Sequence, residues 1–135
     1  MVVHGPVILC RASGIVAGLR CVFAHPEGLE LHFVLRASGV QAEAASRQGQ
    51  VPGSSHPKVH VQVNDRDGVA HPTGGPITTG DDRFFMQTRY WIDELPFDRR
   101  VHITVAWPEA GMPETQRVIM LDDLSGLPER VLPLL

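Results

Sequence analysis

Residues 15–37, which read IVAGLRCVFAHPEGLELHFVLRA, contain two runs of alternating side chains separated by a short turn. Successive side chains of a β-strand point to opposite faces of a sheet, so alternation with a period of two predicts strands. Between the runs lies His25-Pro26-Glu27-Gly28, where proline presets φ at the second turn position and glycine tolerates a left-handed exit. The stretch therefore predicts a β-hairpin.

Each run of this hairpin divides its side chains into two sets. In the first run, the residues on one side are Ile15, Ala17, Leu19, Cys21 and Phe23. In the second run, the residues on one side are Leu29, Leu31, Phe33, Leu35 and Ala37. Such one-sided alternation is typical of antiparallel sheets that have one core face and one solvated face.

Further strands are predicted from the same alternation along the rest of the chain, at 7–11, 58–64, 69–71, 83–95, 101–107 and 115–121. The total of seven or eight strands predicts an all-β fold, an antiparallel β-sandwich, with a flattened β-barrel as the alternative. The facing of the last strand is not determined by its residues. The apolar sides of the other strands predict one core that contains Leu31, Phe33, Val61, Val63, Ile103 and Val105.

The length of 135 residues fits one domain with an ordinary hydrophobic core, so we expect residues 1–135 to form a single domain. The alternation stops between residues 38 and 57. Within this segment 40–47 (VQAEAASR) permits a turn or two of helix, and 48–57 has the composition of a loop. We therefore expect a long loop at 38–57, with further loops at 72–82 and 108–113.

Charge and composition exclude several classes of partner. The formal net charge is −3 with neutral histidines, and the linear sequence shows no basic stripe of the kind that duplex nucleic-acid binders carry, so no nucleic acid partner is expected. No segment approaches the ~20 apolar residues of a membrane-spanning helix, so no membrane partner is expected. The first ten residues lack the basic start of a signal peptide, which predicts a cytoplasmic protein.

The two cysteines, Cys10 and Cys21, both lie in predicted strands that follow one another in the chain. A tight turn at Ala12-Ser13-Gly14 would place Cys10 opposite Val16 or Ala17, so the register favours two free thiols over a disulfide.

Motifs for catalysis, metals and cofactors are weak. His56 and His60 are four residues apart, but on a strand this spacing is about 13 Å at ~3.3 Å per residue, too far to share a metal. His60 and His102 are expected to face solvent and would converge only if their strands were neighbours. Residues 64–68 (NDRDG) fail the calcium-loop pattern and favour a hairpin turn. With no nucleophile or phosphate-loop motif either, the sequence predicts no metal, no cofactor and no catalytic residue.

Several short motifs of the C-terminal half resemble a set of uncharacterised small actinobacterial β-domain proteins. The motifs are Tyr90-Trp91, Leu95-Pro96, Ile103-Thr104-Val105-Ala106-Trp107-Pro108, Gly111 and Pro113-Glu114-Thr115. The resemblance covers less than half of the chain. It implies an intracellular β domain and carries no functional residue over to this sequence.

The strand predicted at 83–95 holds the main functional candidates. If Phe84, Met86 and Ile92 face the core, the opposite side carries Phe85, Gln87, Arg89 and Trp91. Exposed Trp and Arg are common anchors of protein interfaces, whereas a strand buried on both faces would give these residues a structural role. The leading hypothesis is a non-catalytic domain that binds a protein partner or forms a homo-oligomer. The alternative is a small enzyme or ligand-binding protein with its site between the loops 38–57, 72–82 and 108–113.

Overall fold

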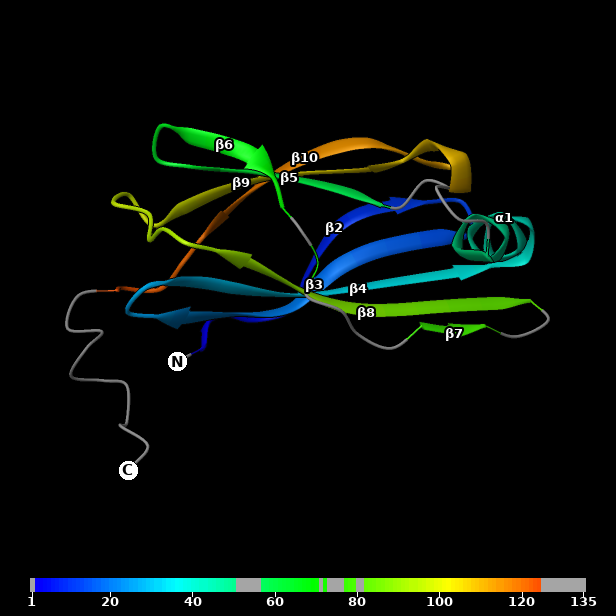
Figure 1. The fold of residues 1–135 in the computed structure, drawn as a ribbon, viewed down its shortest axis with the longest axis horizontal. Helices are drawn as coiled ribbons and strands as arrows, with labels where there is room; N and C mark the ends of the chain where they lie inside the picture. The colour runs from blue at the N-terminus through cyan, green and yellow to red at the C-terminus, as the bar shows by residue number, and fades with distance from the viewer. Residues whose placement is uncertain (1, 51–56, 71, 73–76, 80–81, 125–135) are drawn as a thin grey trace, which may run out of the picture.

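Two antiparallel sheets pack face to face across one apolar core in the computed structural model of the chain (Figure 1). The structure describes residues 2–50, 57–70, 72, 77–79 and 82–124. The two sheets remain separate, so the fold is the predicted all-β sandwich rather than the flattened barrel. No helix among these residues is long and apolar enough to cross a membrane.

Sheet A, the six-stranded sheet, has the order β1-β3-β4-β8-β7, with β2 also paired to β3. Its strands are β1 (Val2–His4), β2 (Val7–Ala12), β3 (Ile15–His25), β4 (Gly28–Ser38), β7 (Ile77–Thr79) and β8 (Arg83–Ile92). Sheet B has the order β10-β9-β5-β6. Its strands are β5 (Lys58–Val63), β6 (Arg66–Val69), β9 (Arg100–Trp107) and β10 (Met112–Met120).

The predicted hairpin is the pair β3–β4, and its register runs from His25 opposite Gly28 to Ile15 opposite Ala37. On β4 the alternation holds throughout, because Leu29, Leu31, Phe33 and Leu35 are all buried. The turn glycine is required by close packing, since a Cβ on Gly28 would lie 2.0 Å from the main-chain oxygen of Ile92.

The unbroken alternation predicted for β3 is wrong in its second half. The β3–β4 register shifts between Leu19 and Cys21, which leaves Arg20 as an extra residue in a β-bulge. A one-residue slip exchanges the two faces of a strand. Val22 and Ala24 are therefore buried, whereas an unbroken alternation would have turned Cys21 and Phe23 inward. The bulge therefore brings Cys21 and Phe23 to the outer face of sheet A.

The predicted core is confirmed. The six residues expected to share one core are at most 6% exposed and belong to one buried cluster: Leu31, Phe33, Val61, Val63, Ile103 and Val105. The last strand, whose facing the sequence did not determine, buries Met112 and Ile119 and exposes most of the residues between them.

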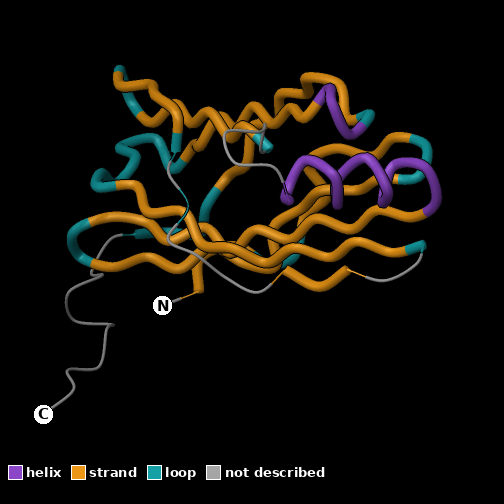
Figure 2. Tube along the Cα trace, turned by 45° about the vertical axis from the view of Figure 1, so that its right-hand side comes forward, coloured by secondary structure: helices purple, strands orange, loops and turns teal. Residues whose placement is uncertain are grey.

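The long loop expected at 38–57 is mostly helix, and this is a correction. Helix α1 spans Gly39–Gln50, so the helix is longer than the one or two turns expected within 40–47. The helix packs on its alanines, since Ala42 and Ala45 are 2% and 0% exposed, and small residues allow the close approach. Figure 2 shows α1 at one end of the sandwich, at the same end as η1 (Pro108–Ala110), which it contacts.

Some element bounds also differ from prediction. Strand β8 ends at Ile92 rather than near residue 95, and β6 begins at Arg66, inside the segment expected to be a turn. The turn between β5 and β6 is tighter because Asn64 adopts a left-handed φ of 56°. The Asn64 side chain also forms hydrogen bonds to the turn that follows β8. Its Nδ2 donates to the Leu95 carbonyl (3.1 Å), and its Oδ1 accepts from the Phe97 N–H (2.8 Å).

Candidate functional site

The strands of sheet A segregate charge. They contain five arginines and one carboxylate, Glu30; the arginines are Arg11, Arg20, Arg36, Arg83 and Arg89. All five arginines are exposed. With neutral histidines these strands carry a formal charge of +4, so the remaining residues of the −3 chain carry −7. A basic surface thus exists on an acidic protein, and the linear sequence hides it because its members come from four strands.

The four residues predicted to bind a partner all lie on the outer face of sheet A. Strand β8 buries the alternate residues, which are Phe84, Met86, Thr88 and Tyr90. Phe85 and Gln87 are half-buried, Arg89 is exposed and Trp91 is 40% exposed. The facing therefore agrees with the alternation of the sequence.

Neighbouring strands supply the partners of these four residues. In the β4–β8 register, Phe85 lies opposite Arg36, Gln87 opposite Val34, Arg89 opposite His32 and Trp91 opposite Glu30. With its amide oriented to satisfy both groups, Gln87 accepts hydrogen bonds from the Arg20 guanidinium at 2.9 and 3.3 Å. The face thus has an arginine-rich end near Phe85 and a second end near Trp91.

The end near Trp91 is built from rings around one carboxylate. The ring centroids of Trp91 and His25 are 5.6 Å apart, and those of Phe23 and His32 are 5.1 Å apart. Glu30 lies between the two imidazoles, with His32 Nε2 at 2.5 Å from one carboxylate oxygen and His25 Nε2 at 3.9 Å from the other. The side chains of this cluster are partly exposed, although the His25 Nε2 atom itself is buried.

Cys21 belongs to the same end, opposite His32 in the β3–β4 register. Burial, and then the nearby charge of Glu30, raise the pKa of the Cys21 thiol above its ordinary value, although Arg20 acts in the opposite direction. A raised pKa disfavours the thiolate, which is the nucleophilic form. Both cysteines are free thiols.

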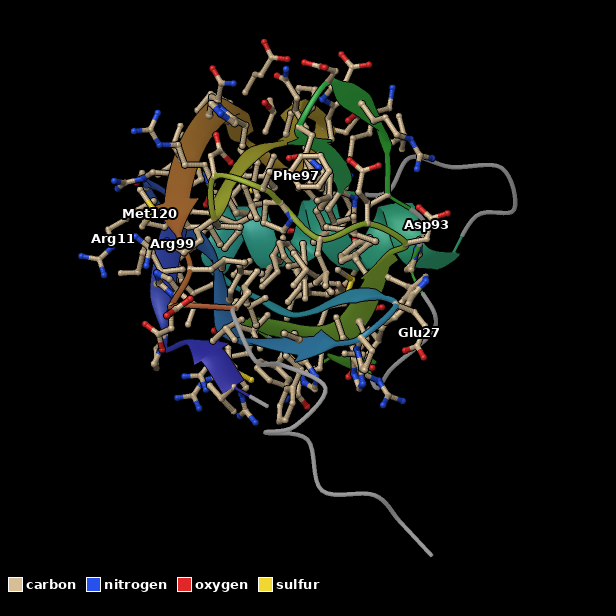
Figure 3. The ribbon with its side chains drawn as sticks, turned by 90° about the vertical axis from the view of Figure 1, so that its left-hand side faces the viewer. Arg11, Glu27, Asp93, Phe97, Arg99 and Met120 are labelled. Atoms are coloured by element: carbon tan, nitrogen blue, oxygen red, sulfur yellow. The ribbon has the colours of Figure 1, made fainter. Side chains whose placement is uncertain are left out.

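A cavity of about 700 Å³ lies at the arginine-rich end. We call it the arginine groove, and its charged lining residues are Arg11, Arg36 and Arg83. The rest of its lining is mostly apolar and includes Val16 and Phe85. Figure 3 shows Arg11 projecting outward at the side of the molecule that carries β2.

Trp91 lines a different and smaller cavity of about 170 Å³. The other lining residues come from β5, β6 and the end of β8. Arg66 also lines this cavity, and its guanidinium lies 3.6 Å from the Asp93 carboxylate and 3.2 Å from the Glu94 carboxylate. The four predicted partner-binding residues thus share one face without sharing one pocket.

The histidines of sheet B lie on neighbouring strands. His60 pairs with Thr104 and Gln62 pairs with His102, so the two histidines are diagonal neighbours. Together with Glu114 they line a polar cavity of about 350 Å³. Among the residues that the structure describes, no three His, Cys, Asp or Glu side chains could together hold a metal ion.

The loops proposed as walls of an alternative site are arranged differently from expectation. Helix α1 and η1 meet through a packed contact in which Ala42, Ala45 and Ala110 are buried. Within the segment 72–82 the structure describes Pro72, β7 and Asp82. Among the described residues of these three segments, Ser38 lines the arginine groove, and Arg83, which directly follows the second segment, lines it too.

Two features escaped the sequence analysis. The arginine groove joins residues 11, 36 and 83, and no local pattern links positions so far apart. Phe97 is 93% exposed at the tip of the turn after β8, and Figure 3 shows it at the end of the sandwich facing the viewer. The exposure of Phe97 could have been predicted, because Pro96-Phe97-Asp98 places a large apolar residue within a predicted turn.

Comparison with known proteins adds no assignment: the chain matches no protein-family model, no curated protein and no solved structure.

Proposed function

We propose that this chain is a non-catalytic protein-interaction domain whose outer face of sheet A binds an acidic surface of a partner protein. The observation that carries the proposal is the charge of +4 on the sheet A strands of a chain whose net charge is −3. Complementary charge steers association and selects the partner.

The residue types of this face support a protein contact. Trp and Arg are enriched among the residues that dominate interface energies, and Trp91 and Arg89 stand two residues apart on one strand. Trp91 offers a large ring that is already packed on one side against His25, so little side-chain freedom is lost on binding. The pair therefore suits the centre of an interface.

A protein partner accounts for this face better than a single-stranded nucleic acid does. Nucleic-acid platforms use free aromatic rings on which bases stack. Here Phe23 contacts His32, Trp91 contacts His25, and the Arg36 guanidinium lies over the ring of Phe85.

The test uses the chain as bait in an extract of its source cells. Four variants accompany it: Trp91→Ala and Arg89→Glu on the proposed face, and Phe97→Ala and Arg117→Glu as matched controls. Phe97 is an exposed aromatic residue and Arg117 an exposed arginine of sheet B, so the controls remove the same chemistry elsewhere. We expect a protein that the parent chain and both controls retain and that both face variants lose.

The contact is then reconstituted from the two purified proteins. Binding should weaken as salt rises, because exposed charge attraction is screened over about 10 Å at 0.1 M ionic strength. Three outcomes would overturn the proposal. They are equal retention by the face variants, a self-associated chain in light scattering with no other protein bound, and saturable binding of a thymidine oligonucleotide that Trp91→Ala abolishes.

A further inference from the structure

The arginine groove brings together three cations from three strands. Arg11 pairs with Val16, and Val16 pairs with Arg36, so the two arginines flank one valine at about 10 Å for two strand spacings. Arg83 lies opposite Ser38, which makes it a diagonal neighbour of Arg36 at roughly 7–8 Å. All three arginines line the same groove, and side chains of this length can reach toward one another at these separations.

None of these three guanidiniums forms an ion pair with a described residue. Elsewhere the described residues do compensate arginines: Arg66 has Asp93 and Glu94, and Arg20 has the Gln87 amide oxygen. Arg36 and Arg83 are diagonal neighbours across the β4–β8 pair, so their like charges repel each other. A bound anion would relieve this repulsion.

The Arg36 guanidinium lies over an aromatic ring. Its guanidinium carbon lies 5.2 Å from the centroid of the Phe85 ring, in a cation–π contact. Stacking uses the flat face of the guanidinium, whereas its five N–H donors point outward in the plane of the group. The donors thus remain available for the paired hydrogen bonds that arginine makes to phosphate and carboxylate oxygens.

The remainder of the groove is mostly apolar, with Val16, Ala37 and Phe85 among its lining residues. Its volume of about 700 Å³ lies within the range of small-molecule sites, roughly 300–1,000 Å³. We propose that the arginine groove binds a small amphipathic anion, a phosphate monoester on an apolar body, with Arg36 and Arg83 holding the phosphate. The groove and Trp91 lie at opposite ends of the same basic face, because Phe85 and Trp91 are six residues apart on β8, about 20 Å at ~3.3 Å per residue.

Calorimetric titration of the full chain tests the proposal with 1-naphthyl phosphate as the probe. The parallel titrations are 1-naphthol, inorganic phosphate and 1-naphthoate, which separate the apolar body, the phosphate and the choice of anion. We expect one saturable site for 1-naphthyl phosphate, weaker binding of 1-naphthoate and inorganic phosphate, and no binding of 1-naphthol.

The variants are Arg36→Gln, Arg83→Gln and the matched control Arg117→Gln. Loss of one charge-assisted pair of hydrogen bonds should weaken binding roughly 10- to 100-fold in each groove variant. Arg117→Gln should bind as the parent chain does. Arg83 has no ring contact among the described residues, so Arg83→Gln keeps the test decisive if Arg36→Gln perturbs folding.

Absence of a saturable site, or unchanged affinity in both groove variants, would overturn the proposal. Inorganic phosphate binding as tightly as 1-naphthyl phosphate would overturn the role of the apolar lining. Neither result bears on the partner captured through Trp91, so failure of this site is distinguishable from failure of the protein contact.

Discussion

Truncation of Phe33 to alanine tests the core of the sandwich most directly. The Phe33 side chain is 1% exposed, and its ring meets Tyr90 edge-on at 84° with the centroids 5.6 Å apart. Removal of a buried phenyl ring typically costs about 3–5 kcal/mol, because burial is lost and a cavity remains. We therefore expect Phe33→Ala to lower the free energy of unfolding by about 4 kcal/mol.

The chain contains its own control for this substitution. Phe97→Ala makes the same chemical change at a side chain that is 93% exposed, so its cost should stay within about 0.5 kcal/mol. Urea unfolding followed by circular dichroism measures both. With a urea slope near 2 kcal/mol/M, the midpoint of Phe33→Ala should fall by about 2 M. A loss below about 1 kcal/mol, or equal losses for the two variants, would refute the assigned facing of β4.

Three further predictions follow from local geometry. Gly28→Ala should lower the melting temperature, because its Cβ would lie 2.0 Å from a main-chain oxygen at the end of β8, whereas Gly68→Ala, with open space around it, should not. Burial raises the pKa of Tyr90 to about 12, so this single tyrosine should ionise in absorbance titrations only far above pH 10. The folded-state pKa of Tyr90 exceeds the unfolded value of 10.0, so its contribution to the free energy of unfolding is complete below pH 10 and is lost as pH rises toward 12. A Tyr90 that ionises near pH 10 in the native protein would contradict this prediction. A chromogenic disulfide reagent should modify the half-buried Cys21 slowly and Cys10, which is 4% exposed, only in denaturant; rapid modification of two thiols in the native protein would be incompatible with the structure.

Strand facing was predictable where a strand pairs regularly along its whole length. The β4–β8 register runs without interruption from Leu29 to Ser38, and there the alternating pattern gives the buried residues correctly. On β3 the same pattern fails after Leu19, because the extra residue Arg20 changes the phase and nothing in the local composition marks it.

Helix α1 was underestimated for a different reason. A helix is usually recognised in a sequence by large apolar residues at intervals of three and four. Here the residues that pack inward are Ala42 and Ala45, whose small side chains give little contrast with the surrounding polar residues. Tertiary contacts with η1, β4 and β8 supply the stabilisation that the pattern does not display.

The candidate site could be predicted only in part. The outward facing of Trp91 and Arg89 depends on one strand and follows from its alternation. The arginine groove depends on the pairing of β2 with β3, β3 with β4 and β4 with β8. Positions that meet through three successive pairings have no signature in a single sequence.

The bulge at Arg20 has a consequence for how the two proposed sites relate. On the edge that faces away from β4, β3 pairs with two different strands. Its residues Ile15–Leu19 pair with β2, and its residues Val22 and Phe23 pair with β1. Three register irregularities therefore fall across one band of sheet A. A bulge bends its strand, so the sheet bends at β3 and its neighbours β1 and β2, whereas the β4–β8 pairing that carries Phe85 and Trp91 continues without interruption. The bend therefore leaves the groove and the Trp91 end about 20 Å apart along β8, which gives one small domain room for an anion and a protein at the same time.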